Sequence, residues 1–196
     1  MAVGRPRAFD IDEALDEALR LFWRKGYEGV SVADLTREMK INPPSLYAAF
    51  GNKEQLFRKA LDRYSEKITA CMGEALEAPT ARESVERLLR RTADRLADPQ
   101  TPNGCLMVQG ALMCGEASDP IRQELTLRRS TSEAAVRHRL ERARDEGDLP
   151  AGVDPAALAR YILIVTEGMS VHAASGASRA ALHEVVDLAM RNWPTP

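Results

Sequence analysis

Closely spaced helix caps in the first eighty residues are the feature that most constrains the fold. Ser31 and Asp34 form the pattern of a capping box, Asn42 precedes a proline at the first helical position, and Asn52 begins another capping pattern. Between these caps the apolar residues recur three or four positions apart, which is helical spacing and not the alternation of strands. The caps therefore predict four helices by about residue 78, the second and third of them very short.

The rest of the chain has the same kind of punctuation and no strand-like alternation. Residues 98–104 have the composition of a loop, and the uncharged apolar segment 105–114 is expected to be a buried helix. Together with the first four helices, these observations predict an all-α protein of nine helices. The expected starts of the remaining helices are Thr80, Asp119, Asp154 and Ser178.

The composition of the 196-residue chain narrows the possible classes of protein. The chain is 44% hydrophobic, but it has no apolar stretch of the roughly 18 residues that a membrane span needs, so no membrane contact is expected. The N-terminus lacks an apolar secretory signal, so a cytoplasmic location is expected. The net charge is −2, and residues 1–64 carry 11 basic and 10 acidic side chains. This balance argues against a surface that coats DNA nonspecifically.

Two short helices, a tight turn and a capped third helix match the plan of a helix-turn-helix unit. In the third helix Leu46 and Phe50 would form the apolar underside that packs on the first helix. The start of that helix can present polar groups and prolines to the major groove. Lys53, in the first turn of the next helix, can bind a phosphate together with free backbone N–H groups. The predicted DNA-binding residues are Arg5 and Arg7 in a basic arm, Ser31, Thr36, Asn42, Pro43, Pro44, Ser45, Tyr47 and Lys53.

Residues 31–57 closely resemble the DNA-binding head of the TetR family of regulators. The most specific part is the spacing L-Y-x-x-F-x-x-K-x-x-L over residues 46–56, and the similarity extends back over residues 21–29. The resemblance implies a nine-helix protein with a two-fold dimer and a ligand-controlled repressor function. By position, it also implies phosphate contacts for Tyr47 and Lys53 and a groove-facing orientation for Asn42 and Ser45.

One position departs from this resemblance. The family usually has glycine in the turn between the second and third helices, whereas this chain has Lys40. A left-handed backbone conformation costs a lysine about 1 kcal/mol. Either the turn adopts another geometry, or Lys40 adds a contact to the DNA backbone.

Residues 53–196 are expected to form an effector-binding and dimerisation domain behind a DNA-binding domain at residues 1–52. The resemblance implies a ligand pocket among helices four to seven and a dimer interface on helices eight and nine. The alternative for the last two helices is that their apolar faces only bury against the rest of the body. The expected pocket residues are Tyr64, Ile68, Met72, Leu88, Thr92, Cys105, Val108, Leu112 and Leu125. The expected interface residues are Leu158, Tyr161, Val165, Met169, Leu182, Val185, Val186 and Ala189.

Cysteine and histidine usage gives no support for a disulfide framework or a metal site. The three cysteines are Cys71, Cys105 and Cys114, and the histidines His138, His172 and His183 are scattered, so no metal and no cofactor is expected. Cys105 leaves two interpretations open. It is either a reactive thiol near a helix N-terminus, which favours the thiolate, or a small core residue.

The methionines and the arginines of the expected C-terminal domain allow two further predictions. Met72, Met107 and Met113, with few aromatic residues around them, indicate an adaptable apolar cavity. Six arginines of the seventh helix are expected to form a solvated face, with an anionic effector site or a set of interface salt bridges as the alternative. They are Arg128, Arg129, Arg137, Arg139, Arg142 and Arg144.

The sequence thus predicts a homodimeric repressor that binds a palindromic DNA operator and leaves it when an unidentified small molecule binds the body. It is not expected to be an enzyme, because no cluster of acid/base, nucleophilic or metal-binding side chains stands out. One alternative is a regulator of the same fold that senses oxidants or electrophiles through Cys105. The other is a helical ligand-binding protein without DNA contact.

Overall fold

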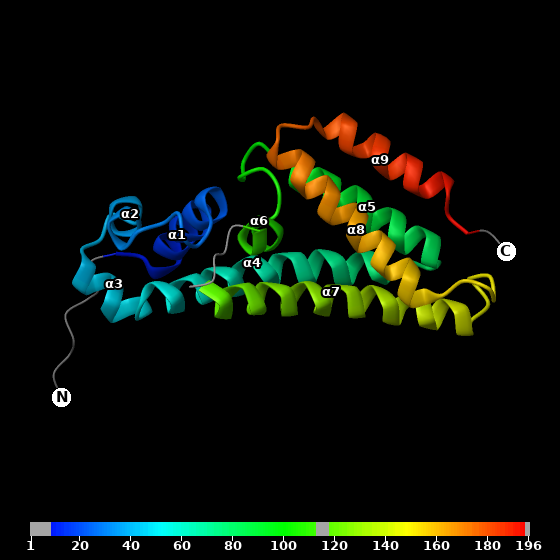
Figure 1. Cartoon of the computed structure of the whole chain (residues 1–196), viewed down its shortest axis with the longest axis horizontal. Coiled ribbons are helices and arrows are strands. Elements are labelled where there is room, and N and C mark those ends of the chain that lie inside the picture. Colours follow the sequence, from blue (N-terminus) through cyan, green and yellow to red (C-terminus); the bar gives the residue numbers. More distant parts are fainter. Residues whose placement is uncertain (1–8, 113–117, 195–196) are drawn as a thin grey trace.

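The computed structural model describes residues 9–112 and 118–194, and within these residues the chain is entirely helical apart from turns and loops (Figure 1). The predicted all-α fold is confirmed. A small head of three helices lies at one end of the molecule, and the remaining helices form an elongated body. The helices are α1 (Ile11–Lys25), α2 (Val32–Glu38), α3 (Pro43–Phe50), α4 (Lys53–Leu76), α5 (Ala81–Leu96), α6 (Leu106–Leu112), α7 (Asp119–Asp145), α8 (Pro155–Ala174) and α9 (Arg179–Arg191).

The caps that the sequence predicts are present in the head. The Ser31 hydroxyl accepts a hydrogen bond from the Asp34 backbone N–H, and the Asp34 carboxylate accepts one from the Ser31 backbone N–H. The Asn42 side chain accepts from the Ser45 N–H at 2.8 Å, and Pro43 occupies the first position of α3. Because each cap satisfies backbone N–H groups that the helix leaves unpaired, helices of seven and eight residues form where the sequence places them.

The long helix α4 joins the head to the body. Its first half packs on α1, where the Phe22 and Phe57 rings lie 5.0 Å apart and the Trp23 and Tyr64 rings 4.7 Å apart. Its second half runs beside α7 in the body (Figure 1). The head and the body therefore share one continuous core along α4. The expected boundary between residues 52 and 53 stays a prediction.

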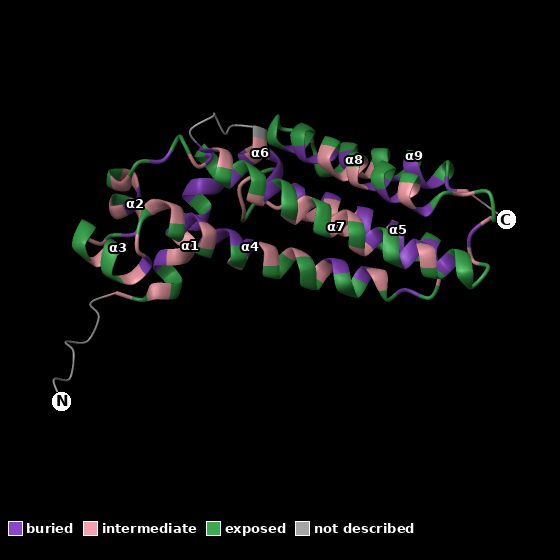
Figure 2. Ribbon diagram, turned by 60° about the horizontal axis from the view of Figure 1, so that its bottom comes forward, coloured by how far each residue is buried: buried purple, intermediate pink, exposed green. Residues whose placement is uncertain are grey.

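The body is a layered bundle in which the apolar faces of α4, α5, α7, α8 and α9 point inward (Figure 2). Arg139 of α7 lies inside it with 4% of its surface exposed. Its guanidinium donates to the backbone carbonyls of Leu76, Ala78 and Pro79 at the C-terminal end of α4. The expectation of a solvated arginine face is therefore wrong for Arg139, because helix-end carbonyls attract a cation.

None of the helices in the described residues is both long and apolar enough to span a membrane.

Candidate nucleic-acid interface and effector cavity

Helix α3 has a buried side and an exposed side, as a recognition helix requires. Leu46 and Phe50 have exposed fractions of 0% and 2% and form its underside, as predicted. Pro43 and Pro44 are exposed at its N-terminal end, and the Tyr47 side chain is 51% exposed. The exposed side thus offers apolar and phenolic surface where a helix-turn-helix protein contacts bases and phosphates.

The turn between α2 and α3 is closed by a left-handed residue. Lys40 has φ of 54°. The Ile41 backbone N–H bonds the Thr36 carbonyl at 3.0 Å and the Lys40 N–H bonds the Arg37 carbonyl at 3.3 Å, which is the Schellman arrangement. Lys40 therefore adopts the conformation usually taken by glycine. The turn therefore keeps the geometry that the family forms with glycine, and Lys40 adopts a strained left-handed backbone conformation.

Four of the predicted DNA contacts already have partners within the chain, one of them being Asn42, whose side chain caps α3. The Ser31 hydroxyl bonds Asp34, and the Thr36 hydroxyl donates to the Ala33 carbonyl at 3.1 Å. The Lys53 ammonium lies 4.4 Å from the centre of the Tyr27 ring. Burial lowers the pKa of Lys53, while the nearby Glu28 carboxylate raises it. Lys53 is thus held at the start of α4. Arg5 and Arg7 lie outside the described residues.

Lys59 of α4 contacts the C-terminal end of α3, and this contact was not predicted from the sequence. Its ammonium donates to the Ala49 carbonyl at 3.3 Å and lies 5.6 Å from the centre of the Phe50 ring. It therefore binds the C-terminal end of α3, where the helix dipole favours a positive charge. The sequence signal is weak, because an exposed lysine on an amphipathic helix is ordinary.

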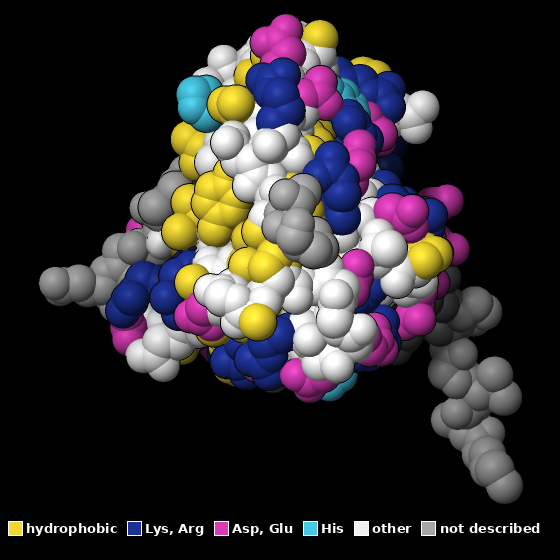
Figure 3. Space-filling view, turned by 90° about the vertical axis from the view of Figure 1, so that its right-hand side faces the viewer, with side chains coloured by type: hydrophobic (Ala, Val, Ile, Leu, Met, Phe, Trp, Pro, Cys, Tyr) yellow, Lys and Arg dark blue, Asp and Glu magenta, His cyan; other side chains and the backbone are white. Residues whose placement is uncertain are grey.

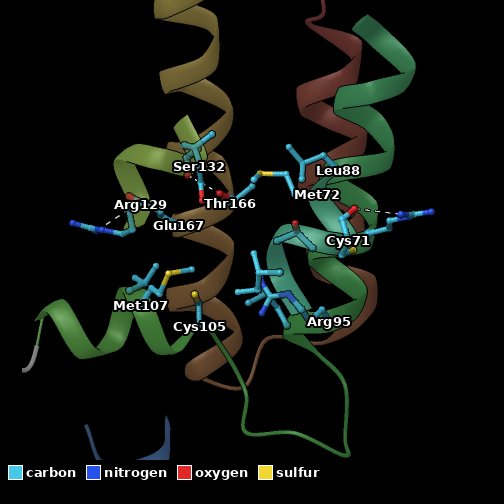
Figure 4. A pocket seen from close by; sticks show the side chains of 16 residues that line it. Cys71, Met72, Leu88, Arg95, Cys105, Met107, Arg129, Ser132, Thr166 and Glu167 are labelled. Atoms are coloured by element: carbon cyan, nitrogen blue, oxygen red, sulfur yellow. Dashed lines mark hydrogen bonds and ion pairs between the residues drawn. The ribbon is translucent and has the colours of Figure 1, made fainter. Parts of the chain in front are cut away.

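The body encloses a mainly apolar cavity of about 80 Å³ between α4, α5, α6, α7 and α8 (Figure 4). Six of the predicted pocket residues line it. Tyr64 and Leu125 are buried behind the wall, and the side chain of Leu112 lies outside the described residues, as do Met113 and Cys114. The six are Ile68, Met72, Leu88, Thr92, Cys105 and Val108.

Several cavity residues were not predicted, because the helices that carry them are far apart in the sequence. The contribution of α8 was missed altogether, and most of the polar lining was missed with it. Among the polar residues, Arg129 of α7 and Glu167 of α8 form an ion pair with an N–O separation of 3.5 Å. Met107 lines the cavity, as expected from the group of methionines, and the additional lining residues are Cys71, Arg91, Arg95, Leu96, Arg129, Ser132, Leu163, Thr166 and Glu167.

A hydrogen-bonded cluster lies at one end of the cavity. The Tyr64 hydroxyl donates to Cys105 Sγ at 3.2 Å and accepts from Arg95 Nη1 at 3.1 Å and from the Leu106 N–H at 3.3 Å. Burial, with a smaller contribution from Cys105, raises the pKa of Tyr64 well above its ordinary value. At neutral pH this residue is therefore a neutral hydroxyl, which joins the sulfur to the guanidinium.

The predicted interface residues divide between two faces of α8 and α9. Tyr161 and Val185 are 46% and 43% exposed, and Leu158 and Val165 are partly buried. The expectation that the other four are available for a partner is wrong, because they pack inside the chain. These are Met169, Leu182, Val186 and Ala189, with exposed fractions of 2%, 2%, 0% and 7%.

Two of the three histidines lie on the surface, and the third lies in the contact between α5 and α9. His138 and His172 are exposed, and His183 of α9 lies 2.7 Å from an oxygen of Asp94 of α5. Within residues 9–112 and 118–194 no three His, Cys, Asp or Glu side chains are grouped so that they could hold a metal ion.

Comparison with known proteins agrees with this geometry. The model of the bacterial regulatory proteins of the tetR family matches residues 14–60, and the tetracyclin repressor-like C-terminal domain matches residues 81–189. The chain belongs to the TetR family. It is a DNA-binding transcriptional repressor of that family and not an enzyme.

Full-length relatives support the assignment. The chain is 34% identical over 193 residues to the transcriptional repressor ComR of Escherichia coli K12, covering 97% of this chain and 92% of ComR. It is 45% identical, with a TM-score of 0.94, to the TetR-family regulator CifR, solved as a triple cysteine mutant with 26-bp operator DNA. That match covers 97% of this chain and 100% of the CifR chain. A TetR regulator from Rhodococcus sp. RHA1 is 44% identical over 95% of this chain and all of its own, with a TM-score of 0.66.

Proposed function

We propose that this TetR-family repressor binds a palindromic operator as a homodimer and is released when a small molecule enters the body cavity. The observation that carries the proposal is the double role of α4. This helix lines the cavity with Ile68, Cys71 and Met72, and it packs Phe57 against Phe22 of the head. A ligand that binds better to one position of α4 than to another must change the population of head positions.

Two further contacts support this coupling. Arg63 of α4 donates to Asp12 and Asp16 of α1, each at 2.7 Å, and so ties the helix to the head. Helix α6, which carries the cavity residue Val108, also contacts α1. Both the wall and the end of the cavity are thus connected to the DNA-binding unit.

The outer face of α8 and α9 supports dimerisation. Of the seven large apolar side chains that are exposed in the described residues, five lie on these two helices. Figure 3 views the molecule from the end of the body and shows apolar side chains gathered mainly on one side of the molecule. A half-site reader needs a two-fold partner, and such a stripe fits an isologous interface. The five are Tyr161, Ile164, Val171, Val185 and Leu188.

The first test is a salt titration of binding to the DNA upstream of the protein's own gene. Because each phosphate contact releases counterions, the affinity should fall steeply as salt rises. Tyr47→Ala should weaken binding roughly tenfold, and Lys53→Ala should reduce the salt slope by about one. Arg87→Ala, an exposed change on α5, is the control and should leave binding unaltered. If neither Tyr47→Ala nor Lys53→Ala changes DNA binding, α3 and the start of α4 are not the DNA interface. DNase footprinting of the wild type would then locate the bound DNA segment.

A second candidate function is favoured by the position of Cys105. Its sulfur lines the cavity and accepts the Tyr64 hydrogen bond, so a molecule in the cavity meets a thiol directly. The relative CifR has been solved with operator DNA as a cysteine mutant. On this reading the repressor responds to an electrophile or oxidant that modifies Cys105.

Labelling with iodoacetamide tests this second candidate. The folded protein is treated for short times, and the alkylation of each cysteine is followed by peptide mass spectrometry. Cys105 should react faster than Cys71 and Cys114 if its surroundings activate it. Equal or slower reaction would assign Cys105 to the core packing alone.

A further inference from the structure

Cys71, Arg91 and Arg95 line both the cavity and an open outer cleft, and so form the mouth of the cavity; the cleft is also lined by Glu74, Asp94, Asp98 and Arg179. Inside the mouth, Met72, Leu88, Met107 and Val108 form an apolar wall, whereas Ser132, Thr166 and the Arg129–Glu167 ion pair line the side made by α7 and α8. A molecule that enters from the cleft passes the two guanidinium groups before it reaches the apolar interior. The polar end of such a molecule is best accommodated at the mouth.

Arg95 differs from the other two arginines of the cavity in its pairing. Arg91 donates to a Glu74 oxygen at 2.8 Å, and Arg129 pairs with Glu167 at 3.5 Å. In the part of the chain that the structure describes, Arg95 forms no ion pair, and its one hydrogen bond goes to the Tyr64 hydroxyl. A guanidinium has five N–H donors, so most of those of Arg95 remain available at the mouth.

Tyr64 holds Arg95 in place. Its hydroxyl is fixed by three hydrogen bonds, to Arg95, to the Leu106 N–H and to Cys105 Sγ. It brings no negative charge, because burial keeps it in the protonated form at neutral pH. The guanidinium is therefore oriented by a neutral partner, and its charge is left uncompensated beside an apolar chamber. A half-buried cation of this kind favours an anion that supplies planar oxygen acceptors.

The size of the chamber limits the apolar part of the ligand. The cavity measures about 80 Å³. An engineered protein cavity of roughly 150 Å³ binds benzene, so this chamber holds only a few carbon atoms. Met72 and Met107 line it, and their flexible side chains can adapt to a short chain or a small branch.

We propose that the cavity binds a small monocarboxylate, with its carboxylate on Arg95 at the mouth and a tail of a few carbons among Met72, Leu88 and Met107. The regulatory consequence of this binding rests on the proposed ligand-controlled function, but the binding itself does not. The unpaired guanidinium disfavours a cation at the mouth, because the Glu74 and Asp94 carboxylates of the outer cleft are already paired with Arg91 and Arg179. A neutral molecule of the same shape leaves the guanidinium without a counter-charge and binds more weakly.

The test is isothermal titration of the DNA-free protein with butyrate, butyramide and 1-butanol, three probes of similar size. Butyrate should bind at least tenfold more tightly than the two neutral probes. Octanoate should bind more weakly than butyrate, because its tail exceeds the chamber. Equal affinities for butyrate and butyramide, or no measurable heat with any probe, would overturn the proposal.

Two matched variants locate the site. Arg95→Gln should weaken butyrate binding at least tenfold, whereas Arg91→Gln, at the same mouth but paired with Glu74, should change it less than threefold. If Arg95→Gln does not fold, Val108→Phe fills the chamber from α6 and should abolish binding of butyrate while keeping Arg95. Unchanged binding in the folded variants would overturn the assignment.

A gel-shift assay with butyrate separates this inference from the proposed function. Butyrate that binds the protein but leaves the operator complex intact confirms the ligand class and contradicts release by this ligand. A protein that binds operator but not butyrate contradicts the ligand class and leaves the repressor function standing.

Discussion

The hydrogen bonds within the head and those within the body join residues at different separations along the sequence. In the head, Ser31 bonds Asp34 and Asn42 bonds Ser45, each three positions along the chain. In the body, Arg139 bonds the Leu76 carbonyl 63 positions away, and Arg95 bonds Tyr64 across 31 positions. Short-range bonds cap the helices of the DNA-reading unit, whereas the cavity depends on contacts between helices that are distant in the sequence. This difference explains why the two regions should respond differently to substitution.

The largest effect is expected from Arg139→Met, which removes the long-range contacts at the end of α4. The substitution removes the guanidinium donors of the Leu76 and Ala78 carbonyls, and the single Ser84 hydroxyl, 3.4 Å from each, cannot replace both, so the free energy of unfolding should fall by about 3 kcal/mol. Urea denaturation at fixed protein concentration measures the change. Arg142→Met, an exposed arginine on the same helix, should change it by less than about 0.5 kcal/mol. Similar values for the two variants would contradict the role given to Arg139.

The same difference decides what could be predicted from the sequence. The capping box at Ser31, the proline start at Pro43 and the underside of Leu46 and Phe50 are contiguous signals, and the structure reproduces each. Lys40 shows the limit of this approach, since the sequence identified the unusual residue but not the conformation that it adopts. Lys59, whose ammonium binds the C-terminal end of α3, has only a weak signal in the sequence.

In the body the sequence could not tell the inner face of a helix from its outer face. Both sides of α8 and α9 are apolar, and the neighbours Val185 and Val186 are 43% and 0% exposed. Helical periodicity predicts that such helices are buried but does not say which side meets its own protomer. Polar cavity residues such as Arg95 and Glu167 were missed for a related reason, since only the tertiary fold brings them to one chamber.

A pair of cap substitutions tests whether local bonds matter equally in both regions. Ser31→Ala in the head and Ser178→Ala in the body each remove a hydroxyl that accepts the N–H of the residue three positions on, at 3.1 and 3.2 Å. Each should cost about 1 kcal/mol. Ser31→Ala should cost more, because the Ser31 hydroxyl also donates to the Asp34 carboxylate, and the reciprocal bond from the Ser31 N–H to that carboxylate is disturbed as well. A greater loss for Ser178→Ala in thermal denaturation would contradict the view that local caps are more important in the head.

The turn before the recognition helix should gain stability from glycine. Lys40 has a left-handed backbone, which costs lysine about 1 kcal/mol, while the greater chain freedom of glycine in the unfolded state offsets part of the gain. Lys40→Gly should therefore stabilise the protein by about 0.5 kcal/mol. Lys67→Gly, at an exposed position inside α4, should destabilise it by about 1 kcal/mol. Chemical denaturation of both variants measures the change in the free energy of unfolding, which should have opposite signs. A loss of stability in Lys40→Gly would show that the lysine makes contacts that outweigh its backbone strain.

The smallest expected effect is the acid sensitivity of the head. Hydrogen bonds from the Ser31 side chain and backbone, with a smaller contribution from Arg37, lower the pKa of Asp34 from 3.8 to about 2. The ionised carboxylate therefore stabilises the folded head fully above pH 3.8, and this contribution is lost as the pH falls through about 2. Between these pH values the stability of the wild type should fall more steeply than that of Asp34→Asn. Asp119→Asn is the counterpart in the body, where bonds from Arg122 and Gln123 lower the pKa of Asp119. Because the head relies on this reciprocal cap, Asp34→Asn should flatten the profile more than Asp119→Asn does. The reverse order, measured by urea denaturation at each pH, would place the acid-sensitive carboxylate in the body.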